Sequence, residues 1–200
     1  MLIERASCEA EMVGLFLKSE IGSARWRPRL LEILDDLQCP VGLLEEPDIT
    51  RNEHNTLRAK VLACFRGYGE NRKLFEAYPA GINWQWVLLD REELSRTKYV
   101  DYSYWNELSG GSRRPGDAAL TIRQGIEVFG VSNRAFLAGV EAVRNGTVFA
   151  EPILVAPDPT GDLVILEGHV RLTIYALAGK DAPQTIRALL GLSPGFALWL

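Results

Sequence analysis

A short segment near the C-terminal end combines residue types that bind anions. Glu167, Gly168, His169, Val170 and Arg171 follow an apolar run, and a helical apolar pattern begins at once. The first peptide N–H groups of a helix lack intrahelical acceptors and carry partial positive charge, so they attract phosphate and carboxylate groups. A glycine beside them lets a ligand approach the backbone closely. The segment is therefore a candidate anion site.

The positive charge of Arg171 has two interpretations. A cation in the first turn of a helix opposes the helix dipole, at a cost of up to about 1 kcal/mol. An anion bound over the amides of residues 169–171 would reverse that cost. Alternatively, Arg171 pairs with Glu167 or with a neighbouring carboxylate, and His169 is an ordinary surface residue. The residues alone leave both interpretations open.

The apolar spacing of the predicted helix indicates which side chains face the core. Val170, Ile174 and Leu177 recur at helical intervals, so we expect that face to pack inward. His169 and Thr173 then lie on another face. The candidate ligand-binding residues at this junction are Gly168, His169, Arg171 and Thr173.

A second candidate anion-binding loop is Ser109, Gly110, Gly111, Ser112 and Arg113. Hydroxyl groups, glycine amides and a guanidinium group are suited to an anion. In the functional interpretation the loop forms a second wall of a nucleotide or substrate site. The alternative is a helix C-cap followed by a solvated basic loop. The chain has no Gly-x-x-x-x-Gly-Lys-[Ser/Thr] motif, so the loop is not a P-loop.

The candidate catalytic residues are Glu151, Glu167 and His169. Glu151 comes just before a predicted strand, and Glu167 just before the junction. A carboxylate can abstract a proton or bind Mg²⁺, although each glutamate taken singly could equally be a surface residue.

The sequence does not predict a protein-held zinc ion or a disulfide framework. Its three cysteines, Cys8, Cys39 and Cys64, are scattered, and no Cys-x-x-Cys pair occurs. Only two histidines are available as imidazole ligands.

Two regions with different patterns must position these residues. The first, residues 1–80, is predicted to contain three or four helices. Pro28 suits a first helical turn, Thr50 to Glu53 reads as a capping box, and Gly67 ends a helix. These helices are a candidate surface for a protein partner or a homodimer.

The second region, residues 84–192, mixes strands with helices. Apolar, branched and aromatic runs predict strands at 84–89, 152–155, 163–166 and 186–190. Helical spacing and caps predict helices at 115–124, 132–144 and 170–178, with an Asp90–Glu93 cap on a shorter turn. Residues 193–200 are expected to form a C-terminal tail.

The order of these elements resembles the ParB/sulfiredoxin-like superfamily, over roughly residues 84–192. The matching pattern is EPILV, GDLVILEGHVRLTIYALAG and IRALLG, and Gly168 and Arg171 match its Gly-x-x-Arg junction. The resemblance implies an α+β domain with a small mixed sheet and flanking helices. It also implies a nucleoside triphosphate or diphosphate, with Mg²⁺, bound at the junction.

Departures from individual members of that superfamily narrow the activity. His169 stands where the sulfinic acid reductases need cysteine, and Val170 interrupts the Gly-Glu-Arg-Arg box of the partition clamps. The nearest motif is the Asp-Gly-His-His-Arg of small-molecule kinases, with one histidine missing. The expectation is binding of a nucleotide or phosphorylated metabolite, with hydrolysis or phosphoryl transfer open. The alternative is a non-enzymatic regulatory or DNA-associated phosphate-binding module.

Composition limits the choice of partners and compartment. The 200 residues are 47% hydrophobic, and the net charge is −4. This charge does not indicate DNA binding by the whole chain, although a local basic patch stays open. The charged N-terminal segment is unlike a signal peptide and no apolar run could span a bilayer, so we expect a cytoplasmic protein without a membrane partner.

Overall fold

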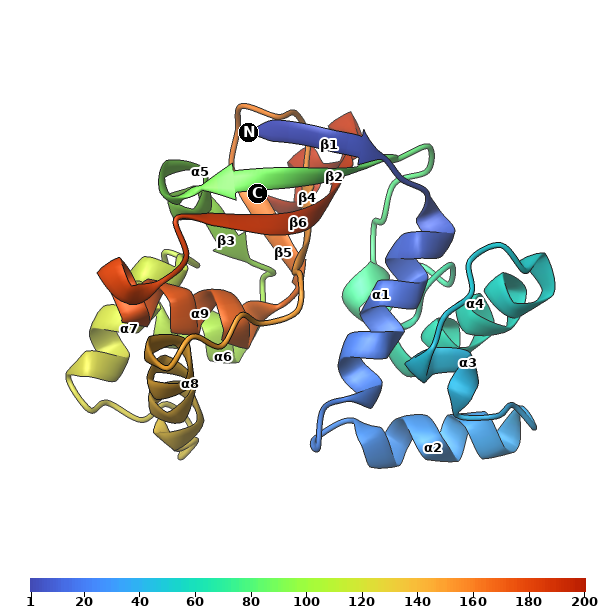
Figure 1. The fold of residues 1–200 in the computed structure, drawn as a ribbon, viewed down its shortest axis with the longest axis horizontal. Coiled ribbons are helices and arrows are strands. Elements are labelled where there is room, and N and C mark those ends of the chain that lie inside the picture. The colour runs from blue at the N-terminus through green and yellow to red at the C-terminus, as the bar shows by residue number, and fades with distance from the viewer. The chain divides into compact units, whose positions relative to one another are not determined.

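The computed structural model describes residues 1–200, which form two compact units (Figure 1). One unit is Ser7–Trp84, and the other combines Met1–Ala6 with Gln85–Leu200. The first six residues thus belong with the later part of the chain, whereas the sequence had placed them in the helical region. No helix combines the length and hydropathy that crossing a bilayer requires.

The unit Ser7–Trp84 is helical, as predicted. Its helices are α1 (Glu9–Ile21), α2 (Arg27–Asp36), α3 (Gly42–Glu45), α4 (Asn52–Arg66) and the 3-10 turn η1 (Lys73–Phe75). Pro28 lies in the first turn of α2, and Gly67 ends α4 with a left-handed φ of 81°. Helix α1 packs against α3 and α4, which buries its apolar side chains, such as Met12 and Phe16.

Of two predicted capping boxes, one forms and the other does not. The Asp90 side chain accepts from the Glu93 N–H, and the Glu93 side chain accepts from the Asp90 N–H, both at 2.9 Å. The Thr50–Glu53 box is wrong. Thr50 instead donates both its N–H and its hydroxyl to Asp48 Oδ1, at 3.0 and 2.6 Å. This local Asx turn competes with capping, and Arg51 becomes the N-cap.

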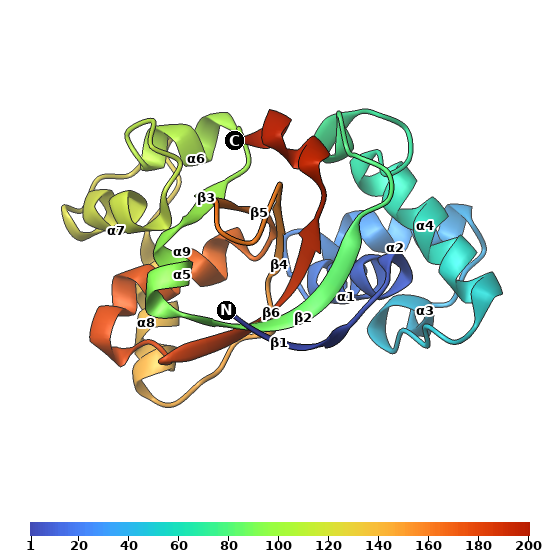
Figure 2. The ribbon, with the colours of Figure 1, turned by 90° about the horizontal axis from the view of Figure 1, so that it is seen from above.

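The other unit contains a mixed sheet of six strands, which confirms the α+β class (Figures 1 and 2). The strands are β1 (Leu2–Ala6), β2 (Asn83–Asp90), β3 (Thr97–Tyr99), β4 (Ile153–Ala156), β5 (Leu163–Glu167) and β6 (Thr185–Leu192). Their order in the sheet is β1-β2-β6-β4-β5-β3. β3 runs parallel to β5 and β4 runs parallel to β6, while the β1–β2 and β4–β5 pairs are antiparallel.

Helices α6 to α9 cover one face of this sheet (Figure 1). The helices of this unit are α5 (Arg91–Ser95), α6 (Ser103–Leu108), α7 (Pro115–Arg123), α8 (Arg134–Arg144) and α9 (His169–Ala178). Two 3-10 segments, η2 (Gly179–Asp181) and η3 (Pro194–Trp199), follow them. α9 packs against both α7 and α8. Most of the predicted C-terminal tail, residues 193–200, forms η3, which contacts β4 and fully buries Phe196.

Strand β3, which the sequence did not predict, determines what surrounds the junction. Its pairing places Tyr99 opposite Ile165 of β5. Since the two strands are parallel, their carboxyl ends meet at one edge of the sheet. The segment after β3 and the start of α9 therefore lie at the same edge.

Candidate functional site

The junction between β5 and α9 lies where the sequence predicted it, although β5 ends one residue later, at Glu167, and α9 begins one residue earlier, at His169. Gly168 is the N-cap of α9, and its carbonyl accepts the first helical hydrogen bond, from the Leu172 N–H at 3.0 Å. Its φ is 106°, a left-handed value that favours glycine. A β-carbon at this position would lie 2.8 Å from Pro152 Cβ. The segment that enters β4 therefore requires a glycine at this position, whether or not a ligand binds here.

The predicted orientation of α9 is wrong at two positions. Val170 is 44% exposed, whereas Thr173 is fully buried. Ile174 and Leu177 are buried as expected. Because both α7 and α8 pack on α9 in addition to the sheet, its buried surface extends around the helix to Thr173. Thr173 is therefore not accessible to a ligand.

Thr173 instead connects β3 to the first turn of α9. Its hydroxyl donates to the carbonyl of His169 at 2.7 Å. The Tyr99 hydroxyl lies 2.6 Å from Thr173 Oγ1. Because Thr173 has only one hydroxyl proton, Tyr99 must be the donor in this pair. Burial raises the pKa of Tyr99 well above its ordinary value, so it stays protonated as this donor requires.

The imidazole of His169 belongs to an aromatic cluster. Its ring centroid lies 5.3 Å from that of Trp105 and 5.8 Å from that of Tyr99, with interplanar angles of 20° and 15°. Trp105 and Tyr99 are themselves stacked at 4.6 Å. The sequence missed the role of Tyr99, since only the β3–β5 pairing brings residues 99 and 169 together.

Arg171 adopts the paired arrangement that was one of its two interpretations. It forms an ion pair with Glu167, and both side chains are only 14% exposed. Its Nη1 also donates to the carbonyl oxygens of Ala150 at 3.0 Å and Glu151 at 3.5 Å. An anion at the junction would compete with the Glu167 carboxylate for this guanidinium group.

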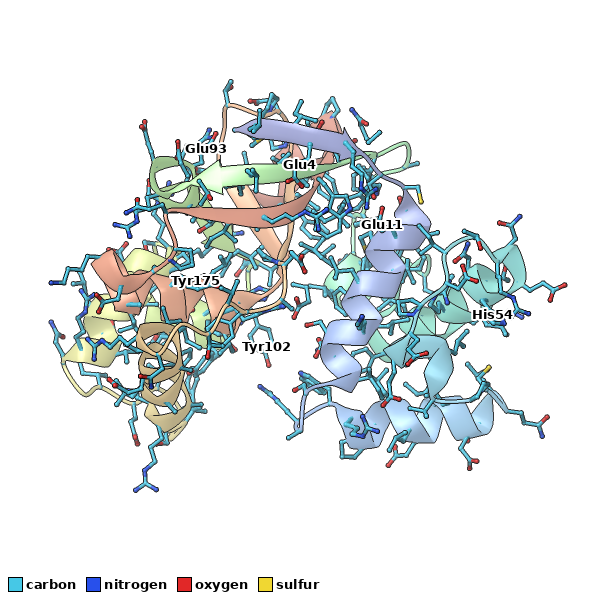
Figure 3. The ribbon with its side chains drawn as sticks, viewed as in Figure 1. Glu4, Glu11, His54, Glu93, Tyr102 and Tyr175 are labelled. Atoms are coloured by element: carbon cyan, nitrogen blue, oxygen red, sulfur yellow. The ribbon has the colours of Figure 1, made fainter.

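Tyr175 fixes the chain segment to which Arg171 donates. It projects from α9 (Figure 3), and its hydroxyl accepts from the Phe149 N–H at 3.0 Å. The rings of Tyr175 and Phe149 also pack, at a centroid distance of 5.5 Å. α9 thus holds the segment before β4 through both Tyr175 and Arg171.

The carboxylate of Glu151 is also close to an arginine. Its Oε1 lies 3.3 Å from Arg187 Nη1, while Arg187 Nε lies 2.7 Å from Glu4 Oε2. The same guanidinium group lies over the ring of Trp86, 3.9 Å from its centroid. No group of three or more His, Cys, Asp or Glu side chains is placed to hold a metal ion. The carboxylates of the junction, on Glu151 and Glu167, are each paired with an arginine.

The loop from Ser109 to Arg113 forms a helix C-cap, as in the alternative interpretation. Ser109 caps α6, and its hydroxyl donates to the carbonyl of Trp105 at 2.7 Å and accepts from the Arg113 N–H at 2.9 Å. The Ser112 hydroxyl donates to the Ser109 carbonyl at 3.0 Å. Gly110 and Gly111 have positive φ values of 61° and 87°. The loop's hydroxyls thus stabilise its own turn.

The guanidinium group of Arg113 is not solvated as that alternative supposed. It donates to the carbonyls of Tyr99, Trp199 and Leu200 at 2.9, 2.7 and 2.8 Å. This arginine therefore joins β3 to the C-terminal segment. The structure brings together Glu151, Glu167, Gly168 and Arg171, whereas the contacts of the loop run to α6, β3 and η3.

Comparisons with protein-family models, with curated proteins and with solved structures gave no match.

Proposed function

We propose that the chain binds a phosphorylated small molecule at the start of α9. The observation that carries this proposal is the composition of the first helical turn. It contains no acidic residue, and its N-cap Gly168 has no side chain, so no negative side chain of this turn offsets the positive end of the helix dipole. A phosphate oxygen would be favoured there by the helix dipole.

Two cationic or polar side chains support an anionic ligand at this place. The Arg171 Nη2 atom is 3.4 Å from the position of a β-carbon on Gly168, so the guanidinium group lies beside the helix start. The His169 ring at the first helical position is backed by Trp105. The competing group is Glu167, and a phosphate with two negative charges can compete with one carboxylate for Arg171.

The arrangement favours binding and supplies no route to turnover. Both candidate carboxylates, on Glu151 and Glu167, face arginines. Nucleotide hydrolysis or phosphoryl transfer is therefore an outcome that the binding experiment must test.

The test measures thermal shift and phosphate release with inorganic phosphate, pyrophosphate and each nucleoside triphosphate, with and without Mg²⁺. We expect at least one phosphate compound to raise the melting temperature of the wild-type protein without phosphate release. Arg171→Ala should lose this shift, whereas Glu167→Gln should increase the affinity, because the guanidinium group no longer has a competing carboxylate.

A matched control is Arg91→Ala. Arg91 also donates to backbone carbonyls, those of Lys180 and Ala182 at 2.9 and 2.7 Å, but it is not part of the junction. This variant should keep the ligand-induced shift. The proposal fails if no phosphate compound shifts the wild-type protein, or if Arg171→Ala keeps the shift. Phosphate release that depends on His169 would show turnover instead of simple binding.

A further inference from the structure

An exposed phenylalanine occupies the tip of a tight turn between α7 and α8. Val128 and Val131 form an antiparallel bridge, and the Val131 N–H donates to the Val128 carbonyl at 3.0 Å. The two residues between them, Phe129 and Gly130, both have positive φ values, of 51° and 70°. The Phe129 side chain is 69% exposed.

Neither the turn nor the solvent explains a phenylalanine at this position. A two-residue turn with positive φ at both positions favours Asn, Asp or Gly, because a β-carbon is disfavoured in the left-handed region. A large side chain there costs conformational energy. Exposure of its ring to water adds no stability to the isolated chain. The side chain is therefore explained best by a contact with another molecule.

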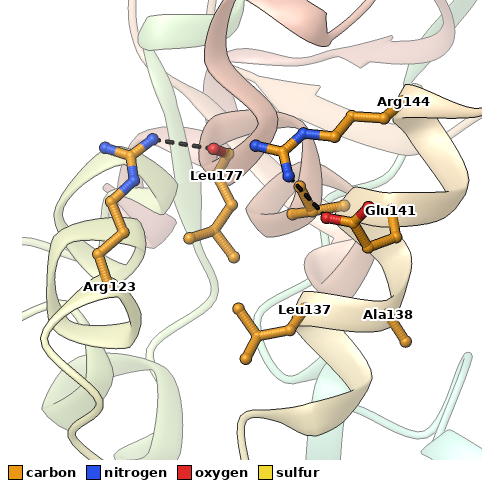
Figure 4. Close-up of a pocket in the computed structure, with 7 residues that line it drawn as sticks. Arg123, Leu137, Ala138, Glu141, Arg144 and Leu177 are labelled. Carbon is orange, nitrogen blue, oxygen red and sulfur yellow. Dashed lines mark hydrogen bonds and ion pairs between the residues drawn. The ribbon is translucent and has the colours of Figure 1, made fainter.

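The same helical layer contains an apolar hollow that such a ring would fit (Figure 4). It has a volume of about 480 Å³ and lies between α7, α8 and the end of α9. Leu137, Ala138, Val140 and Leu177 form its apolar lining. Leu137 is 52% exposed, which leaves apolar surface open at the mouth of the hollow.

The charged groups at the rim favour an aromatic occupant over an anion. Arg144 is already paired with Glu141 and Asp181, at 2.6 and 3.0 Å. Arg123 donates to the carbonyl of Leu177 at 2.9 Å (Figure 4). An anion would have to replace these partners, whereas an aromatic ring can lie against a guanidinium group that keeps them.

We infer that two copies of this chain associate through this surface, with Phe129 of each copy inserted in the hollow of the other. The ring and the hollow occur on one chain, and α8 begins only five residues after Phe129. A twofold axis makes both contacts equivalent and closes the assembly. Other exposed apolar side chains of the same segment would be covered as well: Leu120, Ile126 and Val131. This inference is independent of the proposed phosphate site.

The first test compares Phe129→Asn with the wild-type protein by analytical ultracentrifugation over a range of concentrations. Asparagine suits the turn, so the variant should fold at least as well as the wild type. We expect a wild-type dimer and a dissociation constant weakened about tenfold or more in the variant. Leu198→Asn is the matched control, since Leu198 is 80% exposed in the same unit, and it should leave the dimer unchanged.

A second test addresses the hollow. Leu137→Glu places a carboxylate beside the apolar lining on a helix that tolerates glutamate, and it should also weaken the dimer about tenfold or more. A mixture of Phe129→Asn and Leu137→Glu chains should form a heterodimer, because one intact ring then meets one intact hollow. A monomeric wild-type protein, a Phe129→Asn variant that dimerises as tightly as the wild type, or a mixture that associates no better than its components would overturn the inference.

Discussion

A hydrogen-bonded chain of three groups lies beneath the candidate site. The Tyr99 hydroxyl donates to the Thr173 hydroxyl, which donates to the carbonyl of His169. Both Tyr99 and Thr173 are fully buried. A buried polar group without a partner lowers the stability of the fold. Removing the Thr173 hydroxyl should therefore cost more free energy of unfolding than removing the Tyr99 hydroxyl.

We therefore predict an order of stabilities. Tyr99→Phe should lower the free energy of unfolding by about 1 kcal/mol, since Thr173 keeps its bond to His169. Thr173→Val should cost about 2–3 kcal/mol, because it strands the Tyr99 hydroxyl. The double variant should be more stable than Thr173→Val alone. Urea unfolding checks this order, and simple addition of the two losses would contradict the proposed direction of donation.

At the scale of elements, Asp162 ties the start of β5 to β3 and α7. Its carboxylate accepts from Arg114 Nη2 at 3.0 and 3.1 Å, and it lies 2.9 Å from Lys98 Nζ. Burial acts to raise the pKa of Asp162, but the hydrogen bonds and charges of Lys98 and Arg114 outweigh burial and lower it. The ionised form is therefore favoured in the folded state.

The lowered pKa gives a pH-dependent prediction for Asp162→Asn. The carboxylate's contribution is complete above the unfolded pKa, near 3.8, and is lost as the pH falls through the folded value. At neutral pH the substitution should cost about 1 kcal/mol. In acid, below the folded pKa, the two proteins should converge. Urea midpoints at both pH values measure this, with exposed Glu127→Gln as a control. A loss that is equal at both pH values would refute an electrostatic role.

The sequence predicted those elements whose signal is local. The strands β2, β4, β5 and β6 have long apolar runs, and the Gly168 junction has a cap, a strand before it and a helix after it. β1 and β3 were missed because β1 is exposed along its whole length and β3 has only three residues. β1 and β3 are strands because they pair with β2 and β5. The spacing of residues in the sequence does not indicate this pairing.

The same distinction applies to the candidate site. The local sequence was enough to select Gly168 and Arg171 as candidates. It also suggested an ion pair between Arg171 and the neighbouring Glu167, which the structure contains. The roles of Tyr99 and Arg113 depend on contacts between distant segments. Arg113, for example, binds carbonyls of residues 199 and 200, so its charge could not be assigned from the loop alone.

At the scale of the whole molecule, the sheet is built from both ends of the chain. β1 pairs antiparallel with β2, with Leu2 opposite Leu88 and Ile3 opposite Val87. Arg187 of β6 reaches Glu4 at 2.7 Å. The unit that contains the candidate site is therefore complete only when residues 1–6 are added to 85–200.

Deletion of residues 1–6 removes the edge strand β1 and should leave β2 as the new edge of the sheet. The unpaired backbone groups of β2 would face solvent or another chain, so we expect faster hydrogen exchange in β2 and a greater tendency to aggregate. Strand β5, which lies near the opposite edge of the sheet, should keep its protection, because its partners β3 and β4 remain. Hydrogen exchange with mass spectrometry measures both strands in one sample. Glu4→Gln, which weakens only the contact with Arg187, should change β2 much less. Unchanged protection of β2 after the deletion would mean that β1 contributes nothing to the sheet in solution.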